Sequence, residues 1–349
     1  TIEVGSYDLG ALLARIENAV KKVNAKRVVL DSLGAIFAQL ADSSVVRREL
    51  FNISAALKKL NVTAVMTSER TQEYGEISRY NVEEFVADNV IILRNVLEDG
   101  KRRRTIELLK FRGTDHQKGE FPFTVLVDQG IVVIALSAME LKQNSTTVRI
   151  STGNDVLNKM CGGGYFRDSI VLVTGATGCG KTLLSTEFVS GGASSGQRTL
   201  LFGFEESRDQ LYRNAMGWGY DYEQMEKAGH LRTICEYPES SSLEDHLIRI
   251  KAAIADFKPD RVVIDSLSAL ERVSSPKGYR EFVIGLTSFI KNHEMAGLYT
   301  ATTPTLMGGS SVTEEHISAI TDSIVLLRYV ETFGEMRRSL MVLKMRGSY

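Results

Sequence analysis

The sequence is poor in the features that define several protein classes. Its 349 residues include three cysteines, Cys161, Cys179 and Cys235, whose spacing fits neither a disulfide framework nor a zinc site. No apolar run reaches the roughly 18 residues of a membrane-spanning helix, and no signal peptide is visible. Acidic and basic residues nearly balance, giving a formal net charge of −1, which disfavours binding to nucleic acid. We therefore expect a globular protein of the reducing cytoplasm that does not enter a membrane.

One basic run stands out against this balance, at residues 101–104. It follows Asp99-Gly100, a turn signal between the apolar stretches 90–93 and 106–109. We interpret the run as the solvated tip of a β-hairpin rather than as a nucleic-acid surface.

One segment of the chain occurs twice, 234 residues apart. Arg27-Val28-Val29-Leu30-Asp31-Ser32-Leu33 returns as Arg261-Val262-Val263-Ile264-Asp265-Ser266-Leu267, and the pairs Asp88 and Asp322, Arg94 and Arg328, and Gly113 and Gly347 keep the same shift. A period this long is that of a whole domain, so we predict two copies of one fold in tandem. The polar stretch 142–147 is the predicted linker. The expected domains are residues 1–141 and 151–349, joined by residues 142–150.

Helical and extended patterns alternate along the first copy. Apolar residues recur at helical spacing in residues 9–20 and 50–60, each followed by a short strand-like run, at 27–30 and 63–66. Strands alternate with helices when crossover connections join parallel strands, so the sequence predicts α/β domains with a buried, mostly parallel central sheet. Each copy is expected to end in a hairpin, at residues 90–97 with 105–111 and at residues 324–330 with 339–344.

The second copy contains a complete phosphate-binding motif, G-x-x-x-x-G-K-[ST]. Its residues are Gly175, Ala176, Thr177, Gly178, Cys179, Gly180, Lys181 and Thr182. A strand-like run precedes it and a helix-like segment follows, which is the context that the motif requires. The glycines would turn backbone N–H groups toward phosphates, Lys181 would reach the terminal phosphates, and the Thr182 hydroxyl suits Mg²⁺. Nothing comparable precedes Asp31, so we expect the chain to begin inside its first domain.

Three carboxylates follow predicted strands of the second copy. Asp265 closes an apolar strand, where a carboxylate can lie beside the metal through water. Glu205 and Glu206 follow the strand at 199–204, where P-loop ATPases carry the acid that orients or deprotonates the nucleophile. Adjacent strand residues face opposite ways, so one of the two is expected to face the phosphate. A solvated strand end is the alternative. Asp31 lacks a loop in this chain, so its expected role is structural.

A pair of basic residues recurs at the end of both copies. Lys344 and Arg346 occupy the same repeat position as Lys110 and Arg112. Residues two apart on a strand share a face, so each pair can address one anion. Because the second copy's own loop already supplies a lysine, we expect the pair to reach a neighbouring subunit's phosphates in trans. An exposed strand with solvated charges is the alternative.

Longer motifs resemble the KaiC family of RecA-like ATPases. They are Asp42-Ser43-Ser44-Val45-Val46-Arg47-Arg48-Glu49-Leu50-Phe51, Cys161-Gly162-Gly163-Gly164, the phosphate loop, Phe204-Glu205-Glu206-Ser207, Ile264-Asp265-Ser266-Leu267-Ser268-Ala269-Leu270 and His316-Ile317-Ser318. They fall in the family's order and spacing from end to end. The resemblance implies tandem RecA-like P-loop domains, CI and CII, in a homohexamer with ATP and Mg²⁺ at the subunit interfaces. It also implies slow ATP hydrolysis mainly in CI, and serine/threonine autokinase and autophosphatase activity in CII.

The resemblance also implies roles for individual residues. The catalytic residues of CII would be Glu205 as the base, Glu206, Lys344 and Arg346. The nucleotide contacts of CII would be the phosphate loop with Leu183, Ser207, Trp218, Asp265, Arg338, Lys344, Met345 and Arg346. The nucleotide contacts that remain for CI would be Lys110, Phe111, Arg112, Thr114 and His116. The metal would lie against Thr182, Glu205 and Asp265.

The phosphate-acceptor segment departs from the family pattern. Of an adjacent Ser-Thr pair only Ser318 remains, because Ala319 follows it, while the auxiliary Thr313 is kept. We expect a dominant phosphosite at Ser318 and at most a minor one at Thr313. The alternative is a plain short helix, because Ser311-Val312-Thr313-Glu314 fits a capping box that leaves Ile317 and Ile320 facing the core. Cys179 replaces a Thr of the family loop, with no expected effect.

Two protein partners follow from the same resemblance. A KaiB-like protein would dock on CI near the segment between Gln39 and Val45, and a KaiA-like protein would bind a C-terminal tail beyond Tyr349. We expect a circadian clock ATPase. A RecA-like DNA recombinase or helicase motor, or a non-clock signalling ATPase of the same fold, is the alternative. Ala319 adds weight to the signalling ATPase, because a two-site phosphorylation cycle cannot run on one acceptor.

Overall fold

The computed structural model of the chain describes residues 9–37, 43–70, 72–75, 83–98, 100–127, 129–134, 145–303, 317 and 320–347. The chain divides into two compact units, Thr1–Val133 (unit 1) and Ile134–Tyr349 (unit 2). The domain boundaries predicted above, with a linker at 142–150, stay a prediction, because part of that segment lies outside the described residues.

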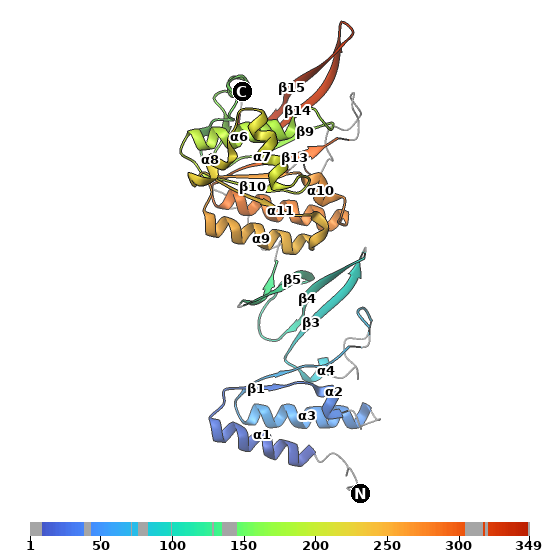
Figure 1. Cartoon of the computed structure of the whole chain (residues 1–349). Coiled ribbons are helices and arrows are strands. Elements are labelled where there is room, and N and C mark those ends of the chain that lie inside the picture. The colour runs from blue at the N-terminus through green and yellow to red at the C-terminus, as the bar shows by residue number, and fades with distance from the viewer. Residues whose placement is uncertain are drawn as a thin grey trace. The chain divides into compact units, whose positions relative to one another are not determined.

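Unit 1 combines a small parallel sheet with an antiparallel one (Figure 1). Its elements are α1 (Leu9–Val23), β1 (Arg27–Leu30), α2 (Leu33–Phe37), α3 (Ser43–Lys59), β2 (Thr63–Met66), α4 (Glu83–Val86), β3 (Asn89–Glu98), β4 (Lys101–Phe111), β5 (Glu120–Leu126) and β6 (Gly130–Val133). β1 and β2 are parallel neighbours, and β3 to β6 form an antiparallel sheet in sequence order. The two predicted helices and the strands that follow them are therefore confirmed.

The core of unit 1 lies on one face of β1 and β2. Alternate strand residues such as Val28 and Leu30 pack against a buried cluster of α2 and α3 that includes Leu50 and Ile53. On the opposite face, Val29 is exposed to 66% of its surface. In unit 1 the expected parallel sheet comprises only these two strands among the described residues.

Unit 2 is built on one large sheet. Its elements are β7 (Arg149–Ile150), α5 (Asp155–Met160), β8 (Tyr165–Phe166), β9 (Ile170–Gly175), α6 (Lys181–Ser194), β10 (Thr199–Gly203), α7 (Arg208–Gly217), α8 (Tyr222–Lys227), β11 (Leu231–Cys235), a 3-10 turn (Pro238–Ser240), α9 (Leu243–Phe257), β12 (Arg261–Asp265), α10 (Leu267–Glu271), α11 (Pro276–Asn292), β13 (Ala296–Thr302), β14 (Ser323–Thr332) and β15 (Glu335–Met345). The order of the strands is β11-β10-β12-β13-β9-β14-β15, and all neighbours are parallel except β14 and β15. This arrangement confirms the predicted α/β class.

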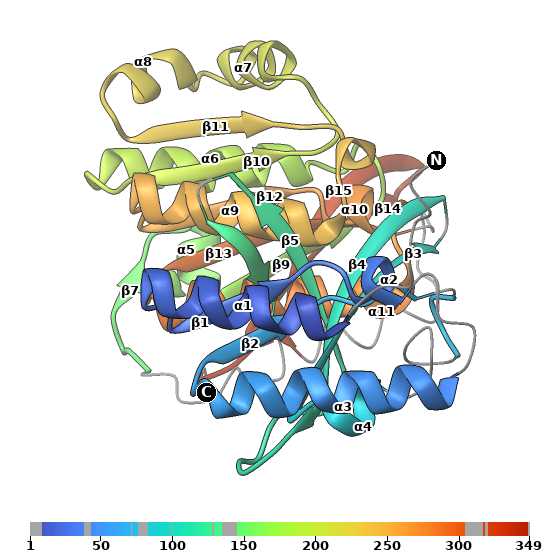
Figure 2. The same cartoon turned by 90° about the horizontal axis from the view of Figure 1, so that it is seen from below.

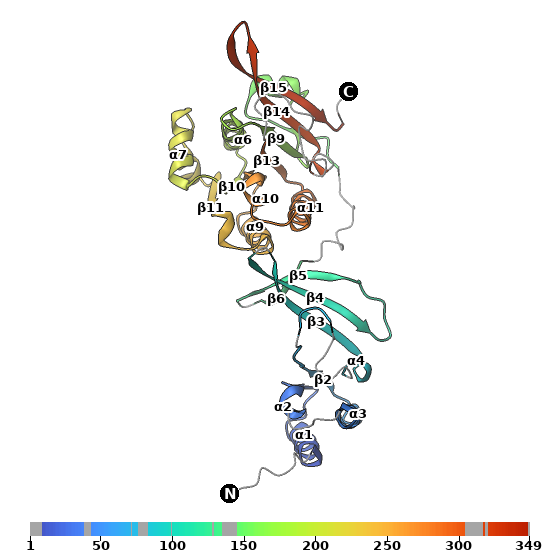
Figure 3. The ribbon, with the colours of Figure 1, turned by 90° about the vertical axis from the view of Figure 1, so that its right-hand side faces the viewer.

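Helices cover both faces of this sheet, because its strands alternate between two cores. Ile170 and Leu172 of β9 point into the core formed with α9 and α11, whereas Val171 and Val173 point into the core formed with α6. Figure 3 shows α6 and α11 on opposite sides of the sheet. Figure 2 shows α7 and α8 beside β11, at the edge of the sheet.

Both units contain the predicted hairpin. β3 pairs with β4 and β14 pairs with β15, and the register shifts between Val90 and Ile91 in one hairpin and between Ile324 and Val325 in the other. These irregularities lie at the same repeat position, so the tandem repeat extends to a local detail of the backbone. In Figure 1 the hairpin of unit 2, drawn in red, extends beyond the rest of its sheet. The basic run at 101–104 lies at the start of β4, directly after the turn, as predicted.

Candidate nucleotide site

The phosphate loop connects the end of β9 to the start of α6, so the strand and helix that the motif requires are both present. Gly180 precedes the helix with φ of 111°, a left-handed conformation that favours glycine. At Gly175, an added Cβ would lie 2.1 Å from the backbone oxygen of Leu327 in β14. Residues 175–182 therefore follow a tight path that depends on glycine for both conformation and space.

Lys181 is folded back onto the loop that it follows. Its Nζ donates to the carbonyl oxygens of Gly175, at 2.9 Å, and Ala176, at 3.0 Å, and the side chain is buried. Carbonyl oxygens are weaker partners for an ammonium than phosphate oxygens, because the phosphate carries charge. The lysine is thus held at the loop in a position from which an anion can recruit it.

Asp265 is buried beside the start of α6. Its carboxylate accepts hydrogen bonds from the hydroxyl groups of Thr300 on β13 and Thr182 on α6. Burial raises the pKa of Asp265, although these two hydrogen bonds oppose the shift. In unit 1, Thr67 donates to Asp31 in the same way. Both units therefore share a hydrogen bond from a threonine to this aspartate, and unit 2 adds the contact between Asp265 and Thr182.

Glu205 and Glu206 lie next to Asp265, because β10 and β12 are neighbours and pair Gly203 with Asp265. Glu205 forms an ion pair with Arg272, at 3.0 Å, whereas Glu206 accepts a hydrogen bond from Asn214, at 3.0 Å. The expected opposite orientation relied on strand alternation, but β10 ends at Gly203 and residues 204–206 form a bend, so that argument does not apply to the two acids. Burial raises the pKa of Glu206, and the nearby charges of Asp265 and Glu205 add to this shift.

The other nucleotide contacts predicted for unit 2 lie on β15, α6 and the two ends of α7. The Tyr329 hydroxyl of β14 donates to Gly178 O at 2.8 Å, and Arg338 is the residue of β15 that pairs with Tyr329. Leu183 lies in the first turn of α6. Ser207 accepts a hydrogen bond as the N-cap of α7, and the half-exposed Trp218 is the C-cap of the same helix.

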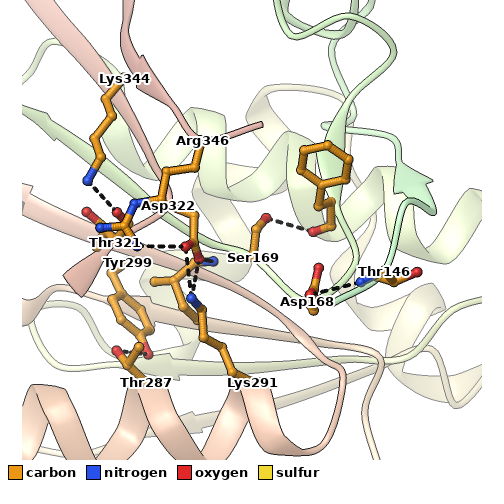
Figure 4. A network of polar contacts seen from close by, with 12 residues as sticks. Thr146, Asp168, Ser169, Thr287, Lys291, Tyr299, Thr321, Asp322, Lys344 and Arg346 are labelled. Atoms are coloured by element: carbon orange, nitrogen blue, oxygen red, sulfur yellow. Dashed lines mark hydrogen bonds and ion pairs between the residues drawn. The ribbon is translucent and has the colours of Figure 1, made fainter. Parts of the chain in front are cut away.

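Lys344 and Arg346 lie away from this loop, at the other end of β9. Met345 pairs with Ser323, and Ser323 pairs with Val171, near the start of the strand that ends at Gly175. A strand rises about 3.3 Å per residue, so four residues separate the pair from the start of the loop by about 13 Å. Lys344 Nζ donates to Thr321 O at 2.8 Å, and Arg346 lies 3.7 Å from Asp322. Figure 4 shows both side chains in this position.

The equivalent pair in unit 1 makes equivalent contacts. Lys110 Nζ donates to the backbone oxygens of Ala87, at 2.7 Å, and Glu84, at 3.0 Å. Arg112 forms an ion pair of 3.1 Å with Asp88. The other nucleotide contacts predicted for unit 1 are Phe111, which ends β4, and Thr114 and His116, which lie between β4 and β5.

The predicted phosphate acceptors, Ser318 and Thr313, lie outside the described residues, as do Gln39 and its next three neighbours. Ile317 and Ile320 are described, and both pack into the core with α11, as the alternative of a plain short helix predicts. Among the described residues, no three His, Cys, Asp or Glu side chains gather as a metal site. A phosphate-bound Mg²⁺ needs only one or two protein ligands, so Thr182 and Asp265 fit such a site.

Sequence reasoning missed four residues that contact the candidate residues: Thr300, Arg272, Tyr329 and Asp322. Each contacts a candidate residue that is distant in sequence, so no local motif marks it. The sequence marked Asp322 only as the repeat counterpart of Asp88, which indicated the tandem repeat but not its contact with Arg346.

Comparison with known proteins identifies similar sequences over nearly the whole chain. The family model described as "ATPase: KaiC" matches residues 1–138 and 150–349. Circadian clock protein KaiC3 from Synechocystis sp. is 65% identical over 344 residues, which cover 99% of this chain and 68% of that protein. Circadian clock oscillator protein KaiC from Thermosynechococcus vestitus is 57% identical over 345 residues, which cover 99% of this chain and 66% of that protein. The chain thus spans about two thirds of the length of these relatives. No described helix is long and apolar enough to cross a membrane.

Proposed function

Because the chain belongs to the KaiC family of ATPases, we propose that unit 2 binds Mg-ATP at the phosphate loop and transfers the terminal phosphate to Ser318. Hydrolysis of ATP would accompany this transfer, and the same site would remove the phosphate again. The observation that carries the proposal is the meeting of Lys181, Thr182 and Asp265 at the ends of β9 and β12. These residues supply a cation for phosphate oxygens and a hydroxyl and a carboxylate for Mg²⁺.

The fit of the loop to a nucleotide rests on charge and space. The start of α6 presents unsatisfied backbone N–H groups, which favour a phosphate at this end of the helix. Lys181 already lies against the loop, so only its hydrogen-bond acceptors need to change when phosphate enters. Thr182 and Asp265 would hold Mg²⁺, whose charge would neutralise that of the phosphates. With Mg²⁺ present, Asp265 would be ionised despite its burial.

Glu205 is the proposed base. In the transfer step the Ser318 oxygen attacks the terminal phosphorus, the bond from phosphorus to the bridging oxygen breaks, and ADP leaves. Glu205 would accept the serine proton, because its carboxylate is partly exposed and held by Arg272 rather than buried. Burial raises the pKa of Glu206, which makes its carboxylate the stronger base, but Asn214 already engages that carboxylate, so Glu206 fits the role less well on geometry.

Assembly of subunits is part of the proposal. Lys344 and Arg346 lie at the end of β9 opposite the loop, so they are badly placed to contact the nucleotide of their own subunit. We infer that they reach the ATP of an adjacent copy in a ring hexamer, with Ser318 also at the interface. Lys110 and Arg112 would act in the same way for nucleotide held by unit 1.

A role in a circadian clock is proposed from the names of the relatives. Binding of a KaiB-like protein near Gln39 and of a KaiA-like protein through a C-terminal tail, and a cytoplasmic location, belong to the same proposal. Because Ala319 removes one acceptor, we expect a single dominant phosphorylation step rather than the ordered use of two neighbouring sites.

Phosphosite mapping tests the proposed function. The chain is incubated with Mg-ATP, digested and analysed by mass spectrometry, with Ser318→Ala and Glu205→Gln variants alongside. We expect phosphate at Ser318, none at that position in either variant, and continued ATP hydrolysis by Ser318→Ala. Unmodified Ser318 during continued ATP hydrolysis would reject the autokinase and leave an ATPase.

A further inference from the structure

Asp322 joins three elements at the end of the sheet where β9 begins. Its backbone N–H donates to Ile170 O, and one carboxylate oxygen accepts from Ile170 N, both at 2.9 Å. Lys291, in the last turn of α11, lies 2.8 Å from the carboxylate. Arg346 donates its backbone N–H to Asp322 O at 2.9 Å and approaches the carboxylate with its side chain at 3.7 Å. Figure 4 shows these side chains converging.

The same arrangement occurs in unit 1 around Asp88. Lys58, in the last turn of α3, lies 3.1 Å from the Asp88 carboxylate, and Arg112 also lies 3.1 Å from it. Arg112 donates its backbone N–H to Asp88 O at 3.2 Å. The residue before each aspartate accepts a hydrogen bond from the lysine of the basic pair. Ala87 O accepts from Lys110 in unit 1, and Thr321 O accepts from Lys344 in unit 2. Two units thus repeat one aspartate with the same set of cations.

The aspartates of the two units share their cation contacts, and Asp322 of unit 2 also contacts β9. In unit 2, Asp322 also closes the hydrogen-bond ladder to β9 through Ile170. In unit 1, Asp88 contacts the lysine of the preceding helix and the arginine of the hairpin. The feature that the units share is therefore the organisation of cations.

Three cations gather near Asp322. Lys291 and Arg346 lie 2.8 and 3.7 Å from its carboxylate, and Lys344 donates to the neighbouring carbonyl of Thr321. Burial lowers the pKa of Lys344, the charges of Arg346 and Lys291 add to this effect, and Asp322 opposes it. A carboxylate in this position keeps the cations close together and favours their charged forms.

We propose that Asp322 is a positioning residue that orients Arg346 and Lys344 toward the ATP of an adjacent subunit, with Asp88 as its counterpart for Arg112 and Lys110. This inference rests on the proposed action of Arg346 in trans. Asp322 itself does not touch the nucleotide. Its carboxylate fixes the end of β15 against α11 and β9, so that the guanidinium does not have to be ordered when the nucleotide binds.

A double-mutant cycle on ATP hydrolysis by the chain tests this inference. Its sequence has one phosphate loop, so turnover reports unit 2. We expect Asp322→Asn to lower kcat roughly 10- to 100-fold with little change in the KM for ATP, because the loop that holds ATP is intact. Arg346→Ala should have a larger effect, and Asp322→Asn should add almost nothing to it.

Two further variants separate positioning from folding. Asp322→Glu keeps the charge and should recover part of the lost turnover, with Asp260→Asn, at an ion pair with Arg167, as a matched control without effect. If Asp322→Asn does not fold, Lys291→Gln replaces it in the cycle and should likewise add nothing to Arg346→Ala.

Three results would contradict the inference. If the double variant loses kcat by the product of the two single losses, Asp322 acts independently of Arg346. Unchanged turnover in folded Asp322→Asn would remove its role. Unchanged turnover in Arg346→Ala would instead contradict the proposed action in trans, and the inference with it.

Discussion

Lys181 is the residue on which nucleotide binding depends most directly. Replacement by alanine removes the only charge that the loop itself offers to the terminal phosphates. A hydrogen bond to a charged group contributes about 1.5–3 kcal/mol, so we expect the affinity for Mg-ATP to fall at least tenfold in Lys181→Ala. Calorimetric titration measures this. Lys227→Ala, at an exposed pair with Glu223 on α8, is the matched control and should bind ATP normally. Undiminished binding by Lys181→Ala would contradict the assignment of the loop.

Asp265 makes the nucleotide-free protein less stable as the pH rises. Its folded pKa is raised by burial, so its contribution to stability is complete below the pKa of an unfolded aspartate and is lost as the pH rises through the folded pKa. Asp265→Asn keeps an acceptor for Thr300 but has no charge. We expect it to raise the unfolding temperature at about pH 8, with less gain at about pH 4, and to abolish Mg-dependent hydrolysis.

Thermal unfolding without nucleotide checks this prediction. Asp256→Asn, at an exposed pair with Arg232, is the control and should change stability by less than about 1 kcal/mol at either pH. A lower unfolding temperature for Asp265→Asn at the higher pH would mean that the carboxylate supports the fold.

At the scale of elements, the approach of the loop to β14 restricts Gly175. A Cβ there would lie 2.1 Å from Leu327 O and 2.8 Å from Cys179 Sγ, and the backbone of β14 cannot yield as a side chain can. We expect Gly175→Ala to lower the free energy of unfolding by about 1–3 kcal/mol or more and to weaken ATP binding. Gly217→Ala is the matched control, because a Cβ there meets no atom within 4 Å and the residue ends α7.

Denaturant unfolding measures the free energy of unfolding of Gly175→Ala and Gly217→Ala. Alanine favours a helix by up to about 1 kcal/mol over glycine, so Gly217→Ala should be unchanged or slightly more stable. Equal effects of the two substitutions would contradict a close contact between the loop and β14.

The elements that local patterns define were predictable, whereas contacts made by distant segments were not. Residues 175–182 and the two hairpins follow from short motifs and alternation, because turn chemistry and strand pairing there are local. The contacts of Asp265 with Thr300 and of Asp322 with Ile170 join segments 35 and 152 residues apart. Only the order of strands in the sheet brings such residues together.

In the candidate site, too, the residues of local motifs were predictable and their positions relative to distant residues were not. The position of Lys344 and Arg346 at the end of β9 away from the loop could not be read from the sequence, because it depends on the register of β14 with β9. That register supports the expectation that the pair acts on a neighbour. The acceptor Ser318 stays a prediction, since it lies outside the described residues.

At the scale of the whole molecule, the two units repeat a pair of aspartates at opposite ends of their sheets. Each unit carries an aspartate that accepts a hydrogen bond from a threonine, exposed in unit 1 and buried in unit 2, and a second aspartate that contacts cations. Only unit 2 of this chain also has a phosphate loop. A ring in which the cations of one copy meet the loop of the next would use both ends of the sheet at every interface.

Mixing of two inactive variants tests this arrangement most directly. Each site in the proposed ring combines Glu205 of one subunit with Arg346 of its neighbour, so Arg346→Ala and Glu205→Gln subunits place their defects on opposite sides of an interface. Random assembly from equal amounts leaves about a quarter of the interfaces without a defect. Action in trans therefore predicts that ATP turnover recovers to about a quarter of the unmodified rate. Turnover no higher than that of the separate variants, in assemblies shown by mass to contain both, would contradict it.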